Sequence, residues 1–434
     1  MPLLGASGVA DEHRARTELR RATALAVALS AASLLACAPA GAAIYFRSAT
    51  TAQTASGASS IALAVPSGVV AGDVLIASID AEGSGTFTAP SGWSSTSLFA
   101  GTINTGYTGV YYHVAGSSEP ASYTWTLGSS RKATGKMAAY VGVENSSPIE
   151  VTSTKAGGPN GPSDNAASLT TTVAKTMVLL DFAALNPAGS FTITPPGGTS
   201  ARASVFTSGT GSVLGSRLDD FVQATAGATP TETYKPSVSI AWGEVTSALK
   251  PGTGTLAFDV APQTPALASV TLKGEAQTTT AQTQMNAFAV DDTTGSGAGW
   301  KVTVAGNSGT GKSAVFKQYC SNGAEPCGGT AANSYVSGGA TLPAGSLQLS
   351  TSGASWSTNG GSGTTPAFQC TSSTCPLDAA SATKIVSAST SAGPWASSAL
   401  SATSLKLSTP STLGVLPANE AYRVDLLWTL SSGP

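Results

Sequence analysis

The sequence predicts an all-β protein built from two β-sandwich or jelly-roll-like modules. Short alternating or continuously apolar runs are separated by Gly, Ser, Pro and Asn, which is typical of antiparallel strands joined by turns. No run has the apolar period of an amphipathic helix. With 434 residues, of which 41% are hydrophobic, the chain is long enough for two or three domains with their own cores.

The charge composition argues against nucleic acid as a partner. Only 10% of the residues are charged, and the formal net charge is -2. Nucleic-acid binding needs clustered Lys and Arg side chains that neutralise phosphates. Solubility must therefore come mainly from hydroxyl and backbone groups.

Residues 1–42 have the pattern of a secretory signal peptide. Four arginines between residues 14 and 21 precede an apolar run from Ala22 to Ala36. This run is shorter than the roughly 20 residues that a transmembrane helix needs. Cleavage after the small-residue site Ala40-Gly41-Ala42 is the favoured processing route, and lipid attachment at Cys37 is the alternative. We expect an extracellular protein at the cell surface or cell wall.

The first module is expected over residues 43–250. Its predicted strands are 61–65, 73–79, 110–114, 123–127, 137–143, 177–182, 191–194 and 238–242.

The first module also contains a weak internal repeat. Val74-Leu75-Ile76, followed by Phe87-Thr88-Ala89-Pro90-Ser91-Gly92, recurs as Val178-Leu179-Leu180, followed by Ile193-Thr194-Pro195-Pro196-Gly197-Gly198. Two arrangements are open: the halves form two related β-layers of one domain, or they form two small sandwiches.

Three short stretches of this module resemble sandwich modules common in secreted and phage-tail-like bacterial proteins. They are Pro90-Ser91-Gly92-Trp93, Tyr112-His113-Val114-Ala115 and Tyr140-Val141-Gly142-Val143. The resemblance is structural and implies no activity. Other surface proteins or a carbohydrate are the partners considered for this module.

The second module is expected over residues 254–434, after the loop Lys250-Pro251-Gly252-Thr253-Gly254. We predict a long loop or a flexible insertion for the Ser/Gly/Thr-rich tract 350–365. The strands predicted before the terminal one are 256–260, 287–290, 300–304, 346–349 and 405–407.

The chain ends on a predicted strand in which Val424, Leu426, Trp428 and Leu430 share one face. The spacing Tyr-x3-Leu-x-Trp-x-Leu-x3-Pro, from Tyr422 to Pro434, resembles the distal motif of the WxL domain.

A second stretch, Asp292-Thr293-Thr294-Gly295-Ser296-Gly297-Ala298-Gly299-Trp300, resembles the proximal motif of the same family. The family usually has Leu two residues after the first Trp, and this chain has Val302. The resemblance implies non-covalent attachment to peptidoglycan or another cell-wall polymer. The wall-binding residues that it implies are Asp292, Gly299, Trp300, Tyr422, Leu426, Trp428, Leu430 and Pro434.

Both motif tryptophans have two interpretations. As core residues, Trp300 and Trp428 would close a sandwich, with each indole N–H bonded to a partner; as surface residues, they would offer flat faces to sugar rings. Aromatic residues in alternating strands usually pack inward, which favours the core interpretation.

Four cysteines follow the leader, an even number that indicates disulfides in an exported chain. Short turn-like stretches separate the members of each pair, so local pairing of Cys320 with Cys327 and of Cys370 with Cys375 is the simplest prediction. A four-cysteine zinc site is the rival, but neither pair has the Cys-x2-Cys spacing.

Gly306-Asn307-Ser308-Gly309-Thr310-Gly311-Lys312-Ser313 formally matches a phosphate-binding loop. Such a loop needs a helix at its end, and Cys320, Gly323 and Pro326 leave little room for one. We therefore expect no bound nucleotide.

The remaining candidates for chemistry are few, and we expect neither a cofactor nor an enzyme. After the leader, His113 is the single histidine, which favours a packed or surface residue over a catalyst. Asp219-Asp220 and Asp291-Asp292 are adjacent pairs, for which turn or surface positions are the prediction. The alternatives to wall attachment are a secreted structural or adhesive protein and a carbohydrate-active enzyme, which would need two convergent carboxylates.

Overall fold

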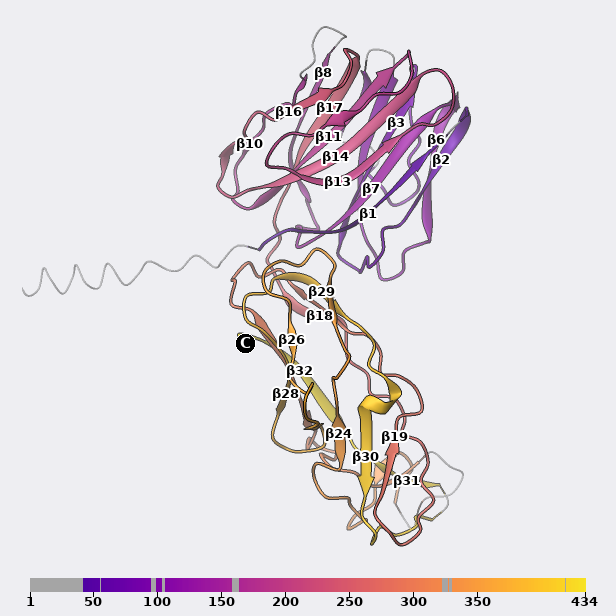
Figure 1. Ribbon diagram of the computed structural model, residues 1–434, viewed down its shortest axis with the longest axis vertical. Helices are drawn as coiled ribbons and strands as arrows, with labels where there is room; N and C mark the ends of the chain where they lie inside the picture. Colours follow the sequence, from indigo (N-terminus) through magenta and orange to yellow (C-terminus); the bar gives the residue numbers. More distant parts are fainter. Residues whose placement is uncertain are drawn as a thin grey trace, which may run out of the picture. The chain divides into compact units, whose positions relative to one another are not determined.

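The computed structural model describes residues 42–54, 56–94, 99–103, 106–157, 164–321, 327, 330–417 and 419–434. In this part of the chain the regular structure is antiparallel β-strand, with one short 3-10 helix, Ala402–Ser404, and no α-helix. The predicted all-β fold with sandwich-like modules is confirmed (Figure 1). The predicted signal peptide lies outside the described residues apart from Ala42. No helix in the described ranges is long and apolar enough to cross a membrane.

Two five-stranded antiparallel sheets form the N-terminal part. The first has the order β1-β7-β3-β5-β4, and the second, read in the matching direction, β8-β17-β11-β14-β13. The strand bounds are β1 Tyr45–Gln53, β3 Val74–Glu82, β4 Phe99–Ile103, β5 Gly106–Val114, β7 Ala133–Val141, β8 Ile149–Gly157, β11 Thr176–Asn186, β13 Ser200–Phe206, β14 Val213–Gln223 and β17 Ala241–Leu249.

The two sheets have the same layout, which gives the internal repeat a structural meaning. β3 and β11 contain the two copies of the repeated apolar run, and each is the central strand of its sheet. In both halves the neighbours of the central strand come from matching positions along the chain: β5 and β7 in one, β14 and β17 in the other. The weak sequence repeat thus corresponds to a repeated sheet.

Each five-stranded sheet has its own outer layer. β2 (Ala58–Ala64) and β6 (Ser122–Arg131) pair with each other, and Leu63 and Trp125 from them pack against Leu75 of the first sheet. On the second sheet the outer strands are β9 Asp164–Asn165, β10 Thr170–Thr171, β12 Ile193–Thr194, β15 Gly227–Ala228 and β16 Thr233–Pro236. Tyr234 of β16 is fully buried against Phe182, with ring centroids 4.4 Å apart.

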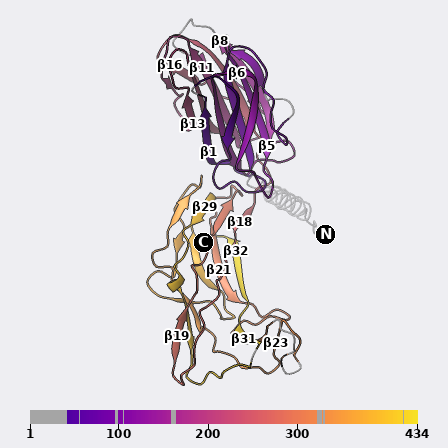
Figure 2. The ribbon, with the colours of Figure 1, turned by 90° about the vertical axis from the view of Figure 1, so that its right-hand side faces the viewer.

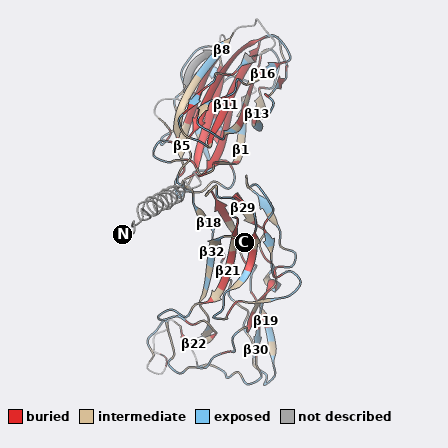
Figure 3. Ribbon diagram, turned by 90° about the vertical axis from the view of Figure 1, so that its left-hand side faces the viewer, coloured by how far each residue is buried: buried red, intermediate tan, exposed pale blue. Residues whose placement is uncertain are grey.

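The inner faces of the two sheets share one core. Ile76 and Tyr140 of the first sheet belong to the same buried cluster as Leu179 and Val245 of the second. β11 is buried along its whole length (Figure 3). Both arrangements left open by the sequence are therefore present. Each five-stranded sheet forms a small sandwich with its own outer layer, and the two five-stranded sheets also pack on each other as two layers around a shared core.

Four smaller sheets form the C-terminal part (Figure 2), in the orders β18-β20-β29-β25, β19-β30-β24-β27, β26-β28-β21-β32 and β23-β22-β31. They contribute to one apolar cluster that includes Phe288, Trp300 and Ile385. The bounds are β18 Leu256–Val260, β19 Gln277–Thr280, β20 Ala289–Asp292, β21 Trp300–Gly306, β22 Lys317–Cys320, β23 Ser334–Tyr335, β24 Leu347–Leu349, β25 Trp356–Thr358, β26 Ala367–Phe368, β27 Cys375–Pro376, β28 Thr383–Ala388, β29 Gly393–Ser397, β30 Leu405–Thr409, β31 Glu420–Arg423 and β32 Leu426–Ser432.

Two strand predictions need correction. The strand expected at 238–242 is β17, Ala241–Leu249, and Val238 is 40% exposed in the turn before it. β17 is covered on both faces, so its sequence lacks the alternation of apolar and polar residues that marks a half-buried strand. Its small and polar residues therefore did not indicate a strand. The tract 350–365 is not wholly a loop, because it contains β25, which pairs with β29. Trp356 of β25 packs against Phe288, with ring centroids 5.4 Å apart.

The prediction that the two aspartate pairs occupy turn or surface positions is wrong. Asp219 and Asp220 lie in β14, Asp291 and Asp292 lie in β20, and all four are buried. The two neighbouring aspartates of β14 do point to opposite faces. Asp219 accepts a hydrogen bond from Tyr234 at 2.9 Å on the outer side, and Asp220 accepts one from Tyr140 at 3.0 Å in the shared core. Hydrogen-bonding and charged partners, which local sequence does not reveal, make their burial tolerable.

Arg47 on β1 holds three carboxylates in a buried cluster. Its guanidinium nitrogens lie 2.7 Å from Asp73, 3.0 Å from Asp259 and 2.6 Å from Asp291. The Arg47 side chain is 1% exposed. Asp73 precedes β3, while Asp259 and Asp291 belong to β18 and β20, so this single cation contacts residues from both predicted modules. Ala42–Pro434 form one unit by their contacts.

Glu244 on β17 predicts a pH dependence of stability. Burial raises the pKa of this carboxyl from its ordinary 4.5 to about 7, although hydrogen bonds from the Thr246 hydroxyl and the Ala167 N–H lower it. The folded state therefore binds a proton that the unfolded state releases. Stability from this group is complete below about pH 4.5 and is lost as the pH rises through about 7, by on the order of 3 kcal/mol at most.

Glu244→Gln should remove this part of the pH dependence, because the neutral amide resembles the protonated acid. Urea unfolding at pH 5 and pH 8 measures it. The variant should lose less stability than the parent between the two pH values. An unchanged difference between pH 5 and pH 8 would show that Glu244 does not titrate in this range.

Candidate functional site

The end of the chain forms two short strands of different sheets rather than one long strand. β31 pairs with β22, and β32 pairs with β21 in a register that places Trp428 opposite Val304 and Leu430 opposite Val302. Val424 and Asp425 connect β31 to β32. The predicted alternation is present. Val424, Leu426, Trp428 and Leu430 pack against the C-terminal core, while Leu427 is 53% exposed.

A groove of about 630 Å³ lies along this terminal segment. One wall is the extended coil Pro262–Leu267, and the other is the segment Tyr422–Leu426 with Trp428. Phe316 and Leu347 also line it. Three residues of the distal motif, Tyr422, Leu426 and Trp428, therefore meet in one open cavity.

A second cavity of about 570 Å³ adjoins the groove. Leu267 and Tyr422 line both. The rest of the second lining is mainly aliphatic, including Leu272, Leu413 and Val415. Val415 is 84% exposed. Tyr422 of the distal motif therefore belongs to the lining of two neighbouring cavities.

Asp425 is the polar centre beside the groove. Its carboxylate accepts hydrogen bonds from the Tyr335 hydroxyl at 2.6 Å and the Ser313 N–H at 3.2 Å. Arg423 lies 3.2 Å and Lys312 lies 3.7 Å from the same carboxylate. Partial burial alone would raise the pKa of Asp425, but these hydrogen bonds and cations lower it below its ordinary value. An ionised acid, Asp425, and the half-exposed Arg423 thus line the groove, and Lys312 lies next to the acid.

The formal phosphate-binding loop lies at this centre and has another role. β21 ends at Gly306, residues 307–316 form turns and bends without a helix, and β22 begins at Lys317. No helix N-terminus is available at the loop, so the phosphate-cradling geometry is missing. Instead, the loop supplies the Ser313 N–H and the Lys312 ammonium group to Asp425.

The proximal motif forms a structural turn whose two ends are buried and whose middle, residues 296–298, is exposed. The Asp292 carboxylate accepts hydrogen bonds from the Thr294 N–H at 3.1 Å and the Thr294 hydroxyl at 2.6 Å. Gly299 has φ 70°, and a Cβ there would lie 1.9 Å from the Ala388 carbonyl oxygen. Only glycine fits this close approach. Asp292, Gly299 and Trp300 therefore shape the entry into β21 and do not line the groove.

The two motif tryptophans differ in environment. Trp300 is fully buried, and its ring lies 5.6 Å from that of Trp356 in an edge-to-face arrangement. Its indole N–H has no hydrogen-bond partner among the described residues, contrary to our expectation for a core tryptophan. Trp428 is only partly buried: it packs on the core and also lines the groove.

The last two motif residues lie away from the groove lining. Leu430 packs against the core, and Pro434 is exposed at the end of the chain. The Pro434 carbonyl oxygen lies 3.5 Å from the Lys301 ammonium nitrogen.

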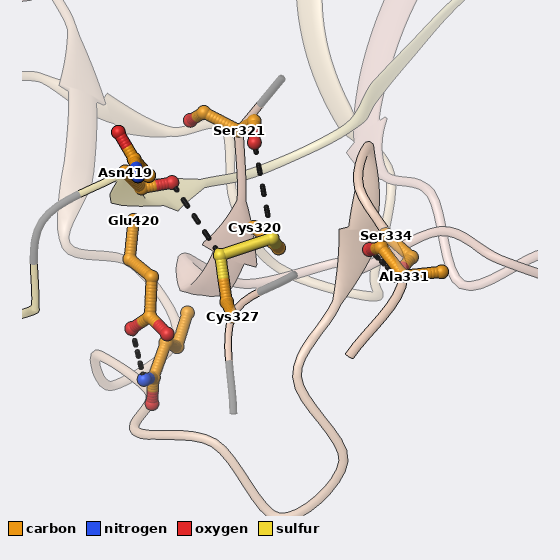
Figure 4. The surroundings of a disulfide bond; sticks show 8 residues. Cys320, Ser321, Cys327, Ala331, Ser334, Asn419 and Glu420 are labelled. Atoms are coloured by element: carbon orange, nitrogen blue, oxygen red, sulfur yellow. Dashed lines mark hydrogen bonds between the residues drawn. A yellow bond between two sulfur atoms is a disulfide. The ribbon is translucent and has the colours of Figure 1, made fainter. Parts of the chain in front are cut away.

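Both predicted disulfides are present. Cys320 pairs with Cys327 and Cys370 with Cys375, with Cα atoms 5.6 Å and 5.7 Å apart. The first lies beside Asn419, immediately before β31 (Figure 4), where the Cys327 sulfur is 3.7 Å from the Asn419 carbonyl oxygen. This disulfide therefore closes a short loop at the end of β22, which itself pairs with β31.

His113 belongs to an aromatic cluster in the N-terminal part. Its Nδ1 lies 2.6 Å from the Gly92 carbonyl oxygen, its Nε2 lies 3.2 Å from Glu119, and its ring stacks on Trp93 at 5.4 Å. In the described ranges, no group of three or more His, Cys, Asp or Glu side chains is placed to hold a metal ion.

Sequence reasoning missed half of the groove. The coil Pro262–Leu267 has no motif, and its only sequence signal is two prolines close together before a Gln- and Thr-rich stretch. Asp425 lies inside the distal motif, but its partners Ser313 and Tyr335 are distant along the chain.

Comparisons with protein-family models, curated proteins and solved structures found no match to this chain.

Proposed function

We propose that this chain is an exported bacterial surface protein that attaches non-covalently to peptidoglycan or another cell-wall polymer through residues 254–434. The groove between Pro262–Leu267 and the terminal segment is the proposed binding site. The observation that carries the proposal is the meeting of Tyr422, Leu426 and Trp428, three residues of the WxL-like distal motif, in that one cavity.

The chemistry of the groove suits a glycan strand with attached peptides. Partly exposed aromatic rings give sugar rings an apolar face to pack on. The ionised Asp425 can accept hydrogen bonds from an amine, while Arg423 and Lys312 can pair with carboxylates. Peptide stems of cell-wall polymers present both groups.

Trp428→Ala should weaken wall binding at least tenfold while the protein stays folded. A central aromatic residue of an interface typically contributes about 2 kcal/mol or more to binding. The assay is co-sedimentation of the full chain with purified bacterial cell walls, with circular dichroism and thermal melting of each variant beside it.

Leu427→Ala is the matched control. Leu427 is the neighbouring strand residue, but it is exposed and is not part of the groove lining. This variant should bind walls as the parent does. Equal binding by a folded Trp428→Ala variant, or equal weakening by both variants, would argue against the groove as the wall site.

A further inference from the structure

A lysine and two aspartates lie together between the two repeated sheets of the N-terminal part. Lys136 of β7 has its ammonium nitrogen 3.0 Å from Asp80 of β3 and 3.1 Å from Asp181 of β11. The side-chain exposures are 0% for Lys136, 0% for Asp80 and 4% for Asp181. Asp80 belongs to the same sheet as Lys136, whereas Asp181 belongs to the facing sheet.

The neighbours of Asp181 on the inner face of β11 are apolar. On β11, Leu179 precedes Asp181 on the inner face as part of the shared core, and Ala183 follows it in a small cluster with Leu214. The cluster is therefore buried between apolar residues on both sides along β11.

Hydroxyl groups complete the contacts of the cluster. The Thr108 hydroxyl donates to Asp80 at 2.7 Å, the Ser78 hydroxyl donates to Asp181 at 3.0 Å, and Ser216 contacts the lysine nitrogen. One carboxyl oxygen of the cluster accepts no hydrogen bond from the described residues. Oδ2 of Asp181 has no hydrogen-bond partner in the described part of the chain.

The cluster contains one cation, Lys136, and two carboxyl groups, which therefore cannot both be ionised at low cost. One cation cannot neutralise two buried carboxylates, and an uncompensated buried charge is costly. Burial and the nearby Asp80 raise the pKa of Asp181, although Lys136 opposes the rise. The unpartnered oxygen of Asp181 and its raised pKa therefore assign the proton of the cluster to Asp181.

We propose that Lys136 and Asp181 condense to an intramolecular amide bond that joins the two repeated sheets covalently. The Lys136 ammonium group gives one proton to the Asp80 carboxylate. The neutral amine then attacks Cγ of the Asp181 carboxylic acid, and the C–N bond forms. The C–O bond to the hydroxyl group breaks, and this hydroxyl leaves as water with a second proton from the nitrogen. Asp80 finishes as a neutral acid beside the new amide.

Two physical reasons favour this reaction. Fixed contact in a packed core replaces a bimolecular encounter, which corresponds to a very high effective concentration of amine. The product also contains no buried charge, whereas the starting cluster contains an ion pair that has lost its hydration. No oxidant, metal or co-reactant is needed, because water is the only leaving molecule.

Intact mass spectrometry of the reduced full chain tests the proposal. The mass should be lower than that calculated from the sequence by one water molecule. Lys136→Arg should have its full calculated mass, because guanidinium does not become a nucleophile at neutral pH. Lys132→Arg is the matched control. In the described part of the chain its ammonium group donates to the carbonyl oxygens of Thr210 and Ser212 and not to a carboxylate, so the water deficit should persist.

Tryptic mapping of the unmodified sequence locates the bond without a variant. Trypsin cannot cleave after an acylated Lys136, so a branched peptide should join residues 133–155 to residues 176–202. A branch from residues 133–155 to residues 48–131, which contain Asp80, would overturn the assignment to Asp181.

Asp181→Asn gives a readout that a purely structural role would not produce. The amide side chain would release ammonia instead of water and leave the same bond, so this variant and the parent should have identical final masses. Full calculated masses for both proteins, with normal tryptic cleavage after Lys136, would overturn the proposal and leave the cluster as an ion pair.

Discussion

Replacing Trp300 with alanine should lower the free energy of unfolding by about 3 to 5 kcal/mol, the usual cost of removing a buried large aromatic side chain. Trp300 is fully buried in the C-terminal core and contacts Trp356 edge to face. The remaining cavity has little chance to collapse, because the strand β21 that holds Trp300 is hydrogen-bonded on both sides, to β28 and β32. Denaturant unfolding of the full chain, followed by tryptophan fluorescence and circular dichroism, measures the loss.

Trp428→Ala is the comparison that separates packing from binding. Both tryptophans belong to the WxL-like motifs, but Trp428 is only partly buried. Its removal should cost clearly less stability, while wall binding falls. Trp300→Ala should lose wall binding only in proportion to the unfolded fraction. Equal stability losses for the two variants would contradict the different roles assigned to them.

Arg47→Ala should cost about 3 to 5 kcal/mol, because removing one partner of a buried ion pair leaves uncompensated charge. Three carboxylates would remain: Asp73, Asp259 and Asp291. Burial already raises the pKa of Asp291 with Arg47 in place. Without the cation, the pKa values of Asp73 and Asp291 should rise further, because Arg47 now lowers both. The variant should therefore regain stability as the pH falls, since protonation removes the buried negative charge.

Arg423→Ala is the control for Arg47→Ala. Arg423 also pairs with an aspartate, at 3.2 Å from Asp425, but its side chain is 47% exposed. Exposed ion pairs contribute roughly 0 to 1 kcal/mol. Unfolding at pH 5 and pH 8 should thus affect the Arg47 variant strongly and the Arg423 variant weakly. A loss for Arg47→Ala no larger than that for Arg423→Ala would mean that the three carboxylates relax or become hydrated.

The sequence by itself predicted the central strand of each repeated sheet, β3 and β11, and both disulfides, but it did not predict β1, β8, β13 or β14. Strands with one covered face can be predicted from the alternation of apolar and polar residues, because alternate side chains share a face. The segment from Val424 to Leu430 is an example. Cys370 and Cys375 are separated by a stretch short enough for a turn, so local closure was predictable from spacing alone. The repeat of Val74-Leu75-Ile76 at Val178-Leu179-Leu180 also correctly indicated two related halves.

Only the tertiary structure decided which strands are covered on both faces and which polar groups are buried. We predicted turn or surface positions for four aspartates that are buried: Asp219, Asp220, Asp291 and Asp292. The sequence of one strand does not reveal whether a tyrosine or an arginine from another strand will contact its aspartates. The packing of the two repeated sheets placed Lys136 against Asp181, although the two residues are 45 positions apart in the sequence.

The groove likewise depends on long-range packing. Pro262–Leu267 forms one wall and Tyr422–Leu426 the other, far apart in the sequence and without a shared pattern. Trp300 and Trp428 occupy similar alternating strands, yet one is sealed by Trp356 and the other borders open space. Local periodicity reports which residues share a face, whereas burial depends on what packs against that face, and only the folded chain supplies that partner.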